Sequence, residues 1–369
     1  MSKSIQDHEA LMARALRCAE QGLLTAHPNP RVGAVVVRDG RVLGEGFHQR
    51  TGGPHAEVEA VAAANGDVTG ASVYCTMEPC SFEGRTPSCA QMLIDRGIRQ
   101  LVYGMEDPHP NNRGRGFSML RAAGVEVIGP ILEESARRLN PGHIKRYETG
   151  FPYVRLKLAS SLDGRTALAS GESRWVTGAS ARRDVQRLRA RSGAILTGVG
   201  TVNADDPSLT VRAGELDSPY ASISADVPRT IAVVDSMGRM NPNAALCNDP
   251  SLIHYSQHPG NLTIKGQSIA APLLNRRVDL QWVLSDLAGR DCHEVLAECG
   301  STLAGALVAS CLVDEIVLYL APKLMGQDAR PLLDIAKIDS MQAVKRWQLE
   351  DVRQVGQDVR LTMLPPIDS

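Results

Sequence analysis

Three side chains in the first half of the chain combine the residue types and the spacing that bind a catalytic zinc ion. His55 lies two residues before Glu57, Cys80 follows Pro79, and Cys89 comes nine residues after Cys80. One imidazole and two thiolates bind zinc well, and three protein ligands leave a fourth position open for water. Zinc lowers the pKa of such a water to about 7. The pattern predicts a hydrolytic metal site with these three residues as ligands.

Glu57 is the predicted catalytic residue of this site. Its distance of two residues from His55 allows its carboxylate to lie beside the metal without binding it. It is therefore expected to take a proton from the water and return it to a leaving amine. The arrangement resembles the H-x-E and P-C-x-x-C signature of zinc nucleobase deaminases. The spacing of nine between Cys80 and Cys89, in place of three, is the difference.

A purely structural zinc site, or thiols that only pack in the core, are the alternatives. A structural site normally has four protein ligands. Cys75 is the nearest candidate, but it lies within a predicted buried strand and is interpreted as a small core residue. His48 is interpreted as a polar surface residue. Glu78 is expected only to orient the turn at Pro79 and Cys80.

The second half contains glycine-rich turns that follow predicted strands. Gly198-Val-Gly200 is a weak signal, because Asn203 stands where the dinucleotide-binding fingerprint needs glycine. Glu298-Cys-Gly300-Ser-Thr302 is stronger, since a strand ends there and a helix begins. The free amides of a helix N-terminus favour phosphate. An ordinary tight turn remains the alternative in both places.

A basic excess also precedes these turns. Between Arg155 and Arg191 there are nine Lys or Arg residues against three acids. They indicate either a solvated helix face or a site for phosphate groups, which arginine binds as a planar fork.

The order of predicted elements indicates two α/β domains in tandem, residues 1–149 and 150–369. Short β-branched runs alternate with helical segments throughout, and the alternation breaks near Asn140-Pro141-Gly142 and Gly150-Phe151-Pro152. Residues 213–228 and 258–275 are rich in Ser, Pro, Asp and Asn and are predicted to be surface loops. The predicted strands are 31–38, 72–77, 102–105, 125–128, 154–158, 194–197, 231–235, 252–255, 295–298, 316–320 and 359–363, and the predicted helices are 56–64, 90–96, 181–191 and 303–312.

Composition excludes several classes of protein. The 369 residues include 40 Lys and Arg and 41 Asp and Glu, so a protein that coats nucleic acid is not expected. The longest apolar stretch, 303–313, is far shorter than the roughly 20 residues that span a bilayer. Acidic residues near the N-terminus argue against a signal peptide. The eight cysteines suit core thiols or metal ligands in a reducing cytoplasm, and a homo-oligomer acting on a small molecule is expected.

Longer motifs around the zinc residues closely resemble the bifunctional deaminase/reductases of riboflavin biosynthesis. This resemblance implies a cytidine-deaminase-like α/β/α domain followed by a dihydrofolate-reductase-like α/β domain, with Asn29, Arg85 and Thr86 holding the first substrate. Phe82-Glu83 departs from the residues common in the family. The motifs are His27-Pro-Asn-Pro-Arg-Val-Gly33, Gly53-Pro-His-Ala-Glu57, Glu78-Pro-Cys-Ser81 and Gly84-Arg-Thr-Pro-Ser-Cys89.

The resemblance continues through the second half, beginning at Lys157-Leu-Ala-Ser-Ser161-Leu-Asp-Gly-Arg165-Thr166-Ala167. It implies that this domain uses NADPH. Cys299 and Ser301 depart from the family there. The residues that it implies contact NADPH are Ala159, Trp175, Thr201, Asp205, Ser236, Gly300, Ser301, Thr302, Leu303, Ala304, Gly305 and Ala306. Those that it implies contact the ribosyl-phosphate substrate are Ser173, Arg189, Leu209, Arg212 and Glu298.

The resemblance implies two consecutive reactions. The first domain would deaminate 2,5-diamino-6-(5-phosphoribosylamino)pyrimidin-4-one with zinc, and the second would reduce the ribosyl group of the product to ribityl with NADPH. The alternative is a zinc nucleobase or tRNA deaminase fused to a reductase-like domain of other specificity.

Overall fold

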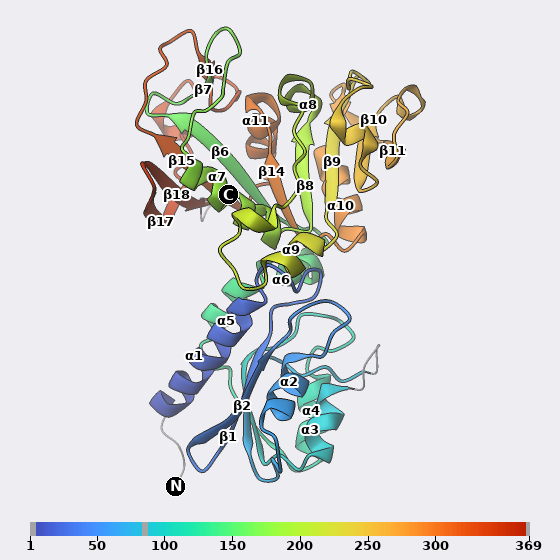
Figure 1. Cartoon of the computed structure of the whole chain (residues 1–369), viewed down its shortest axis with the longest axis vertical. Coiled ribbons are helices and arrows are strands. Elements are labelled where there is room, and N and C mark those ends of the chain that lie inside the picture. The colour runs from blue at the N-terminus through green and yellow to red at the C-terminus, as the bar shows by residue number, and fades with distance from the viewer. Residues whose placement is uncertain (1–4, 83–87, 367–369) are drawn as a thin grey trace. The chain divides into compact units, whose positions relative to one another are not determined.

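The computed structural model of the chain describes residues 5–82 and 88–366. By its internal contacts the chain divides into two units, Met1–Gly150 and Phe151–Ser369. Each unit is built on its own β-sheet with helices on both faces (Figure 1). In the described residues, no helix has both the length and the apolar character that crossing a bilayer requires.

The first unit has a mixed five-stranded sheet. β1 pairs antiparallel with β2 and β3, whereas β3, β4 and β5 run parallel. β1 and β3 are apolar along nearly their whole length, without alternation of polar and apolar residues. This is expected because helices cover both faces of the sheet at these strands. In sheet order the strands are β2 (Arg41–Phe47), β1 (Gly33–Arg38), β3 (Ser72–Met77), β4 (Gln100–Met105) and β5 (Glu126–Ile128).

Two helical layers cover this sheet and give it two apolar cores. One layer is formed by α2 (Ala56–Ala63), α3 (Cys89–Asp95) and α4 (Arg115–Ala122), and the other by α1 (Ile5–Gln21), α5 (Glu133–Leu139) and α6 (Pro141–Thr149). α2 lies very close to β2. A Cβ atom on Gly44 would lie 2.3 Å from the carbonyl oxygen of Ala60, and one on Gly46 would lie 2.4 Å from its nitrogen. These glycines therefore fix the position of the helix that begins after His55.

The second unit has a larger sheet that is parallel over most of its width. All neighbouring pairs from β11 to β15 are parallel, and β18 and β17 continue the sheet as an antiparallel hairpin. In sheet order the strands are β11 (Gln267–Ala270), β10 (Leu252–Ser256), β9 (Thr230–Asp235), β8 (Ala194–Gly198), β14 (Glu294–Glu298), β6 (Tyr153–Ser161), β15 (Glu315–Ala321), β18 (Asp358–Leu364) and β17 (Gln348–Val355). Two short ribbons accompany it, β7 (Arg165–Ala167) with β16 (Arg330–Pro331), and β12 (Leu273–Leu274) with β13 (Arg277–Val278).

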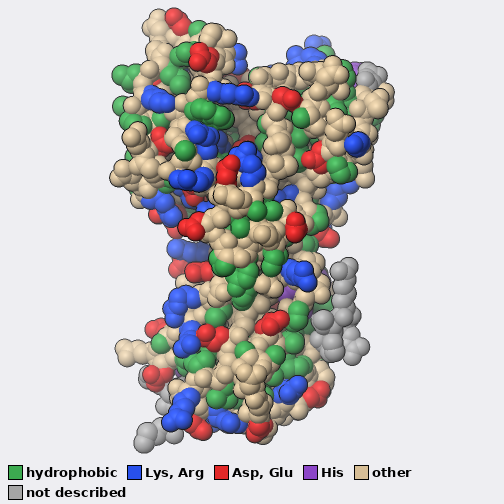
Figure 2. Space-filling model, viewed as in Figure 1, with side chains coloured by type: hydrophobic (Ala, Val, Ile, Leu, Met, Phe, Trp, Pro, Cys, Tyr) green, Lys and Arg blue, Asp and Glu red, His purple; other side chains and the backbone are tan. Residues whose placement is uncertain are grey.

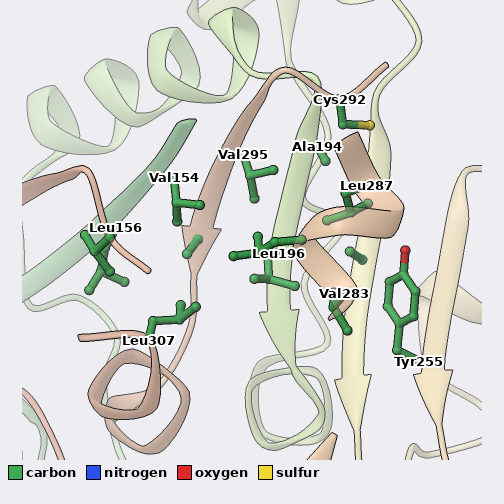
Figure 3. Close-up of a cluster of buried hydrophobic side chains, with 14 of the residues drawn as sticks. Val154, Leu156, Ala194, Leu196, Tyr255, Val283, Leu287, Cys292, Val295 and Leu307 are labelled. Atoms are coloured by element: carbon green, nitrogen blue, oxygen red, sulfur yellow. The ribbon is translucent and has the colours of Figure 1, made fainter. Parts of the chain in front are cut away.

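Helices again cover both faces. Figure 3 shows the larger core, in which Leu287 of α10 (Leu280–Gly289) and Leu307 of α11 (Ser301–Ala309) lie near Leu196 and Val295 of the sheet. On the other face, α7 (Ala179–Arg191) packs against β14 and β15, and α8 (Val199–Asp205) packs over β8 and β9. The strands thus end at a common edge, from which the connecting turns lead into α8 and α11.

Two predicted loops contain regular structure, so those predictions are wrong. Residues 213–228 include the helix α9 (Ala221–Asp226), and residues 258–275 include β11 and β12. β11 forms because its backbone completes the open edge of β10, with Ser268 opposite His254. Such pairing depends on tertiary context, which overrides the polar composition of the segment.

Candidate functional sites

The three predicted zinc ligands converge in the first unit. His55 is the N-cap residue of α2, Cys80 follows β3, and Cys89 is the first residue of α3. The Nδ1 atom of His55 lies 3.3 Å from the Sγ of Cys89 and 3.6 Å from the Sγ of Cys80. In the described residues this is the one group of three metal-binding side chains whose ligand atoms lie within 4.8 Å of one another.

These distances fit a tetrahedral zinc ion. Zn–N and Zn–S bonds of about 2.1 and 2.3 Å at a tetrahedral angle place the nitrogen and sulfur about 3.6 Å apart. The hydrogen bond from Cys89 lowers the pKa of Cys80, which favours the thiolate form of Cys80. The thiolate is the form that binds metal. Cys75 is fully buried in β3 and is not a member of the group, which agrees with its interpretation as a core residue.

Backbone contacts hold the two cysteines close together. The N–H of Cys89 donates to the Sγ of Cys80 at 3.2 Å. The hydroxyl of Ser88 donates to the carbonyl oxygen of Cys80 and also accepts from the N–H of Gln91 as the cap of α3. The separation of nine residues is therefore closed by hydrogen bonds that need no metal.

Glu57 lies in the first turn of α2 and is buried beside the ligands. Burial raises the pKa of Glu57 to about 7, and a hydrogen bond with Cys89 places its carboxylate next to a metal ligand. Glu78, expected to orient the turn at Pro79 and Cys80, forms its hydrogen bonds with a different segment. Its carboxylate accepts hydrogen bonds from the N–H groups of Gly114 and Gly116 at 3.0 and 2.9 Å, and thereby connects the end of β3 to the start of α4.

The interpretation of His48 as a surface residue is wrong. Its side chain is 3% exposed, and burial lowers its pKa, so that it is neutral. Its ring lies between the amide nitrogen of Asn29, 3.0 Å from Nε2, and the carbonyl oxygen of Pro54, 2.9 Å from Nδ1. It thus links the predicted substrate residue Asn29 to the segment that precedes His55. Arg85 and Thr86, the other predicted substrate residues, lie outside the described residues, as does Glu83.

The second unit contains a cavity of about 1660 Å³ at the carboxyl ends of β6, β8, β9 and β14. Ligands bind at such an edge in open parallel sheets. Most of the residues predicted to contact NADPH or the substrate line it: Ala159, Ser173, Trp175, Arg189, Thr201, Asp205, Leu209, Arg212, Ser236, Glu298, Gly300, Ser301, Thr302, Leu303 and Ala306. Ala304 and Gly305 do not. Ala304 is part of the core, and Gly305 packs against the backbone of Asp334.

The turn between β14 and α11 suits a phosphate group. Gly300 is the N-cap residue of α11, and no side chain caps the helix there. Its N–H donates to the hydroxyl of Thr201 at 3.1 Å, which joins the starts of α8 and α11. Lys and Arg outnumber Asp and Glu among the lining residues of the cavity by ten to five. The free amides and the excess of cations both fit an anionic dinucleotide.

Arg189 and Glu298 form a buried ion pair in the wall of this cavity. The Nε and Nη2 atoms of Arg189 lie 2.6 and 3.0 Å from the two carboxylate oxygens of Glu298. Burial raises the pKa of Glu298, but the charge and hydrogen bonds of Arg189 together with the charge of Lys157 outweigh burial, and the net shift is downward. Arg212 instead pairs with Glu215, and both of these side chains are partly exposed.

Sequence reasoning did not single out Lys157, which also lines the cavity. Burial lowers the pKa of its amine, and the opposing charge of Glu298 acts to raise it. The sequence feature that could have identified Lys157 is its place in the predicted buried strand Val154–Leu158. Lysine is rarely buried unless its charge has a partner.

Comparisons with known proteins agree with both sites. Residues 5–105 match the cytidine and deoxycytidylate deaminase zinc-binding region, and residues 152–361 match the RibD C-terminal domain. Fold and site together define a zinc-dependent deaminase joined to a reductase.

Relatives extend this match over nearly the whole chain. The riboflavin biosynthesis protein RibD of Escherichia coli is 43% identical over 363 residues, which cover 96% of this chain and 99% of that protein. The Haemophilus influenzae RibD is 41% identical over 96% of both chains. A solved structure of Acinetobacter baumannii RibD superposes with a TM-score of 0.91 at 39% identity, covering 98% of this chain and 99% of that one. The chain belongs to the RibD family of riboflavin biosynthesis proteins.

Proposed function

We propose that the chain catalyses two consecutive steps of riboflavin biosynthesis. The first unit removes an amino group from 2,5-diamino-6-(5-phosphoribosylamino)pyrimidin-4-one by hydrolysis, and the second reduces the ribosyl group of the product to ribityl. The solved structure of the Thermotoga maritima diaminohydroxyphosphoribosylaminopyrimidine deaminase/5-amino-6-(5-phosphoribosylamino)uracil reductase is 30% identical and has a TM-score of 0.85, with 98% of this chain covered. Full-length similarity to such proteins favours this function over a nucleobase deaminase fused to a reductase of other specificity.

The observation that carries the deaminase proposal is the cluster of His55, Cys80 and Cys89 with Glu57 beside it. When bound there, zinc supplies a Lewis acid that makes water a nucleophile at neutral pH. His55, Cys80 and Cys89 would hold this ion. Glu57 takes the proton of the attacking water and delivers a proton to the departing amine. His48, held by Asn29, orients the segment that leads to His55 through its contact with the carbonyl oxygen of Pro54.

In the second unit, NADPH supplies the hydride, and the residues of the cavity orient both ligands. The first turn of α11 holds the pyrophosphate with its free amides, and Trp175 offers a flat apolar face. Arg212 binds the phosphate of the substrate. Arg189 holds Glu298 in one orientation, and Glu298 accepts hydrogen bonds from sugar hydroxyls.

The decisive experiment follows ammonia release and NADPH absorbance together. Glu57→Gln keeps the volume of the side chain but cannot exchange a proton, so ammonia release should fall about 10²- to 10⁴-fold. Given the deaminated intermediate, the same variant should oxidise NADPH at the wild-type rate. Glu59→Gln on the same helix is the matched control and should affect neither reaction. Rapid NADPH oxidation by Glu57→Gln with the original substrate would refute the proposed order.

We also propose that the enzyme is a cytoplasmic homo-oligomer. All eight cysteines are free thiols, as in a reducing compartment.

β17 is the edge strand of its sheet, and Leu349 and Val352 on it are 61% and 54% exposed. Antiparallel pairing of two β17 strands about Val352 would place Asp351 opposite Arg353 of the second copy. Light scattering after gel filtration should detect a dimer that Val352→Lys disrupts; a monomeric wild type would refute the proposal.

A further inference from the structure

A completely buried asparagine contacts the turn that carries Cys80 in the first unit. Lys, Arg, Asp and Glu side chains are spread over the visible surface of this unit, where water solvates them (Figure 2). Asn112 is instead 0% exposed and lies in the segment between β4 and α4. A buried side-chain amide is costly unless the protein supplies its hydrogen-bond partners. The partners of Asn112 therefore indicate what an amide does at this position.

Asn112 contacts the peptide groups on both sides of Cys80. Its Oδ1 atom accepts a hydrogen bond from the N–H of Ser81 at 2.8 Å. Its Nδ2 atom donates to the carbonyl oxygen of Pro79 at 3.5 Å, which is the upper limit for such a bond. The carbonyl oxygen of Cys80 itself accepts from the hydroxyl of Ser88 at 2.7 Å. With the backbone held in this way, the Sγ atom of Cys80 moves only by rotation about the Cα–Cβ bond.

Asp107 fixes the orientation of the Asn112 amide. Its Oδ2 atom accepts a hydrogen bond from the Nδ2 atom of Asn112 at 3.1 Å. Its Oδ1 atom accepts from the N–H of His109 at 3.0 Å and lies 2.9 Å from the Nε2 atom of His143 on α6. Burial raises the pKa of Asp107, but the hydrogen bond and charge of His143, with the hydrogen bonds from His109 and Asn112, outweigh burial, and the net shift is downward. The amide therefore has a carboxylate on its donor side and a backbone N–H on its acceptor side.

Glu78 joins the same segment to the end of β3, where the turn begins. Its N–H donates to the carbonyl oxygen of Met105 at 2.9 Å, and its carboxylate accepts from backbone N–H groups at the start of α4. The contacts of Glu78 thus attach the strand end, and those of Asn112 attach the two peptide groups next to the metal ligand. Since these bonds use no ligand atom, they leave the Sγ atom of Cys80 available to a metal ion.

We propose that Asn112 is a positioning residue of the zinc site, which directs Cys80 toward the metal by holding the two peptide groups that flank it. This inference rests on the proposed deaminase function. Groups that orient a metal ligand typically change metal affinity or activity 10- to 100-fold. An aspartate at this position would still accept from the N–H of Ser81, but it would place a second carboxylate against Asp107. An alanine would leave both of these partners without the amide.

The test measures the binding of zinc and of cobalt to the full-length protein. Competition with a chromogenic chelator gives the zinc affinity, and the visible absorption of Co²⁺ bound in the same site reports on the geometry of its ligands. Asn112→Ala and Asn112→Asp should each raise the Kd of zinc about tenfold or more and shift the absorption bands of bound Co²⁺. Asn111→Ala is the matched control and should change neither, because Asn111 is exposed and contacts His109 through its backbone N–H.

An exchange of the two polar groups separates positioning from a general loss of structure. In the double variant Asn112→Asp/Asp107→Asn the amide and the carboxylate change places, so that a donor again faces an acceptor. Its zinc affinity should recover from that of Asn112→Asp toward that of the wild type. With zinc in excess, the single variants should lower kcat for ammonia release and leave KM for the pyrimidine unchanged. NADPH oxidation with the deaminated intermediate depends on the other unit and should keep the wild-type rate.

The outcomes separate this inference from the proposed function. Unchanged zinc affinity and an unchanged Co²⁺ spectrum in both single variants would overturn the inference. A double variant that binds zinc as weakly as Asn112→Asp would also overturn it, because the loss would then not arise from the hydrogen bonds. In both cases ammonia release by the wild type upholds the deaminase. A wild type that binds zinc but releases no ammonia from the pyrimidine would overturn the deaminase function, while the metal measurements still decide the role of Asn112.

Discussion

Breaking the ion pair of Arg189 and Glu298 tests the architecture of the reductase site. Arg189→Met removes the cation but keeps most of the apolar stem, so Glu298 is left buried without its partner. The two side chains are only 13% and 10% exposed, which puts the pair among buried ion pairs, whose disruption costs about 3–5 kcal/mol. Lys157 is a second cation near Glu298 and partly replaces the missing charge. We therefore expect a loss of about 3 kcal/mol.

Urea unfolding followed by tryptophan fluorescence measures this loss selectively. All three tryptophans, Trp175, Trp282 and Trp347, lie in the second unit, so the signal reports on the reductase. For a unit of this size a loss of about 3 kcal/mol lowers Tm by roughly 6–12 °C. Ammonia release depends on the other unit and should be unchanged.

A double-mutant cycle decides whether the pair itself is responsible. Arg189→Met leaves the charge of Glu298 without its partner, and Glu298→Gln removes that charge. The unfolding free energy of the double variant should therefore exceed the value expected from adding the two single effects, by about 1 kcal/mol or more. Additive effects within about 0.5 kcal/mol, or a loss below about 1 kcal/mol for Arg189→Met alone, would refute the argument that the two charges depend on each other.

Three further predictions concern the metal, the substrate phosphate and pH. Metal analysis should find about one zinc per chain, retained in Cys75→Ala and lost in Cys80→Ala; loss in both would mean that Cys75 is a fourth ligand. Arg212→Ala should raise the KM of the deaminated intermediate about tenfold or more and leave that of NADPH unchanged, whereas equal effects would contradict its assignment. Burial raises the pKa of Glu315, but the charge and hydrogen bond of Arg155, together with Arg191 and Tyr153, outweigh burial, and the net shift is downward. The stabilisation by Glu315 is therefore complete above its ordinary pKa of about 4.3 and is lost as pH falls through the lower folded value. The difference in unfolding free energy between wild type and Glu315→Gln should therefore shrink from about pH 6 to pH 3, and a constant difference would argue against this linkage.

The zinc site was predictable from sequence because its information is local. Among the motif residues, histidine and cysteine are the types that bind zinc best. His55 and Glu57 lie at the start of the same helix, so their closeness follows from their spacing in the sequence. The burial of His48 was not predictable, because it depends on Asn29 and Pro54 reaching the ring from two different segments. Local spacing therefore predicted the three side chains that converge, but not the buried histidine that contacts the segment before His55.

The reductase site depends more on distant contacts. Arg189 and Glu298 are 109 residues apart, and no spacing rule pairs them. The resemblance implies cofactor contacts for the whole stretch 300–306, but successive side chains of a helix point in different directions, and Ala304 belongs to the buried core. β11 was missed because an edge strand is stabilised by its neighbour more than by its own composition.

Cys299, one of the departures from the family, has a consequence for how this enzyme responds to reactive chemicals. It lines the cofactor cavity between Glu298 and Gly300, where burial and the adjacent carboxylate raise its pKa to about 12. At neutral pH this thiol is therefore protonated, and the thiolate is the form that attacks electrophiles and peroxide. Cys299 should therefore react with peroxide more slowly than an exposed cysteine of low pKa. For the same reason, an inhibitor of this cavity has to gain its affinity through reversible contacts, since a warhead directed at this sulfur would react too slowly.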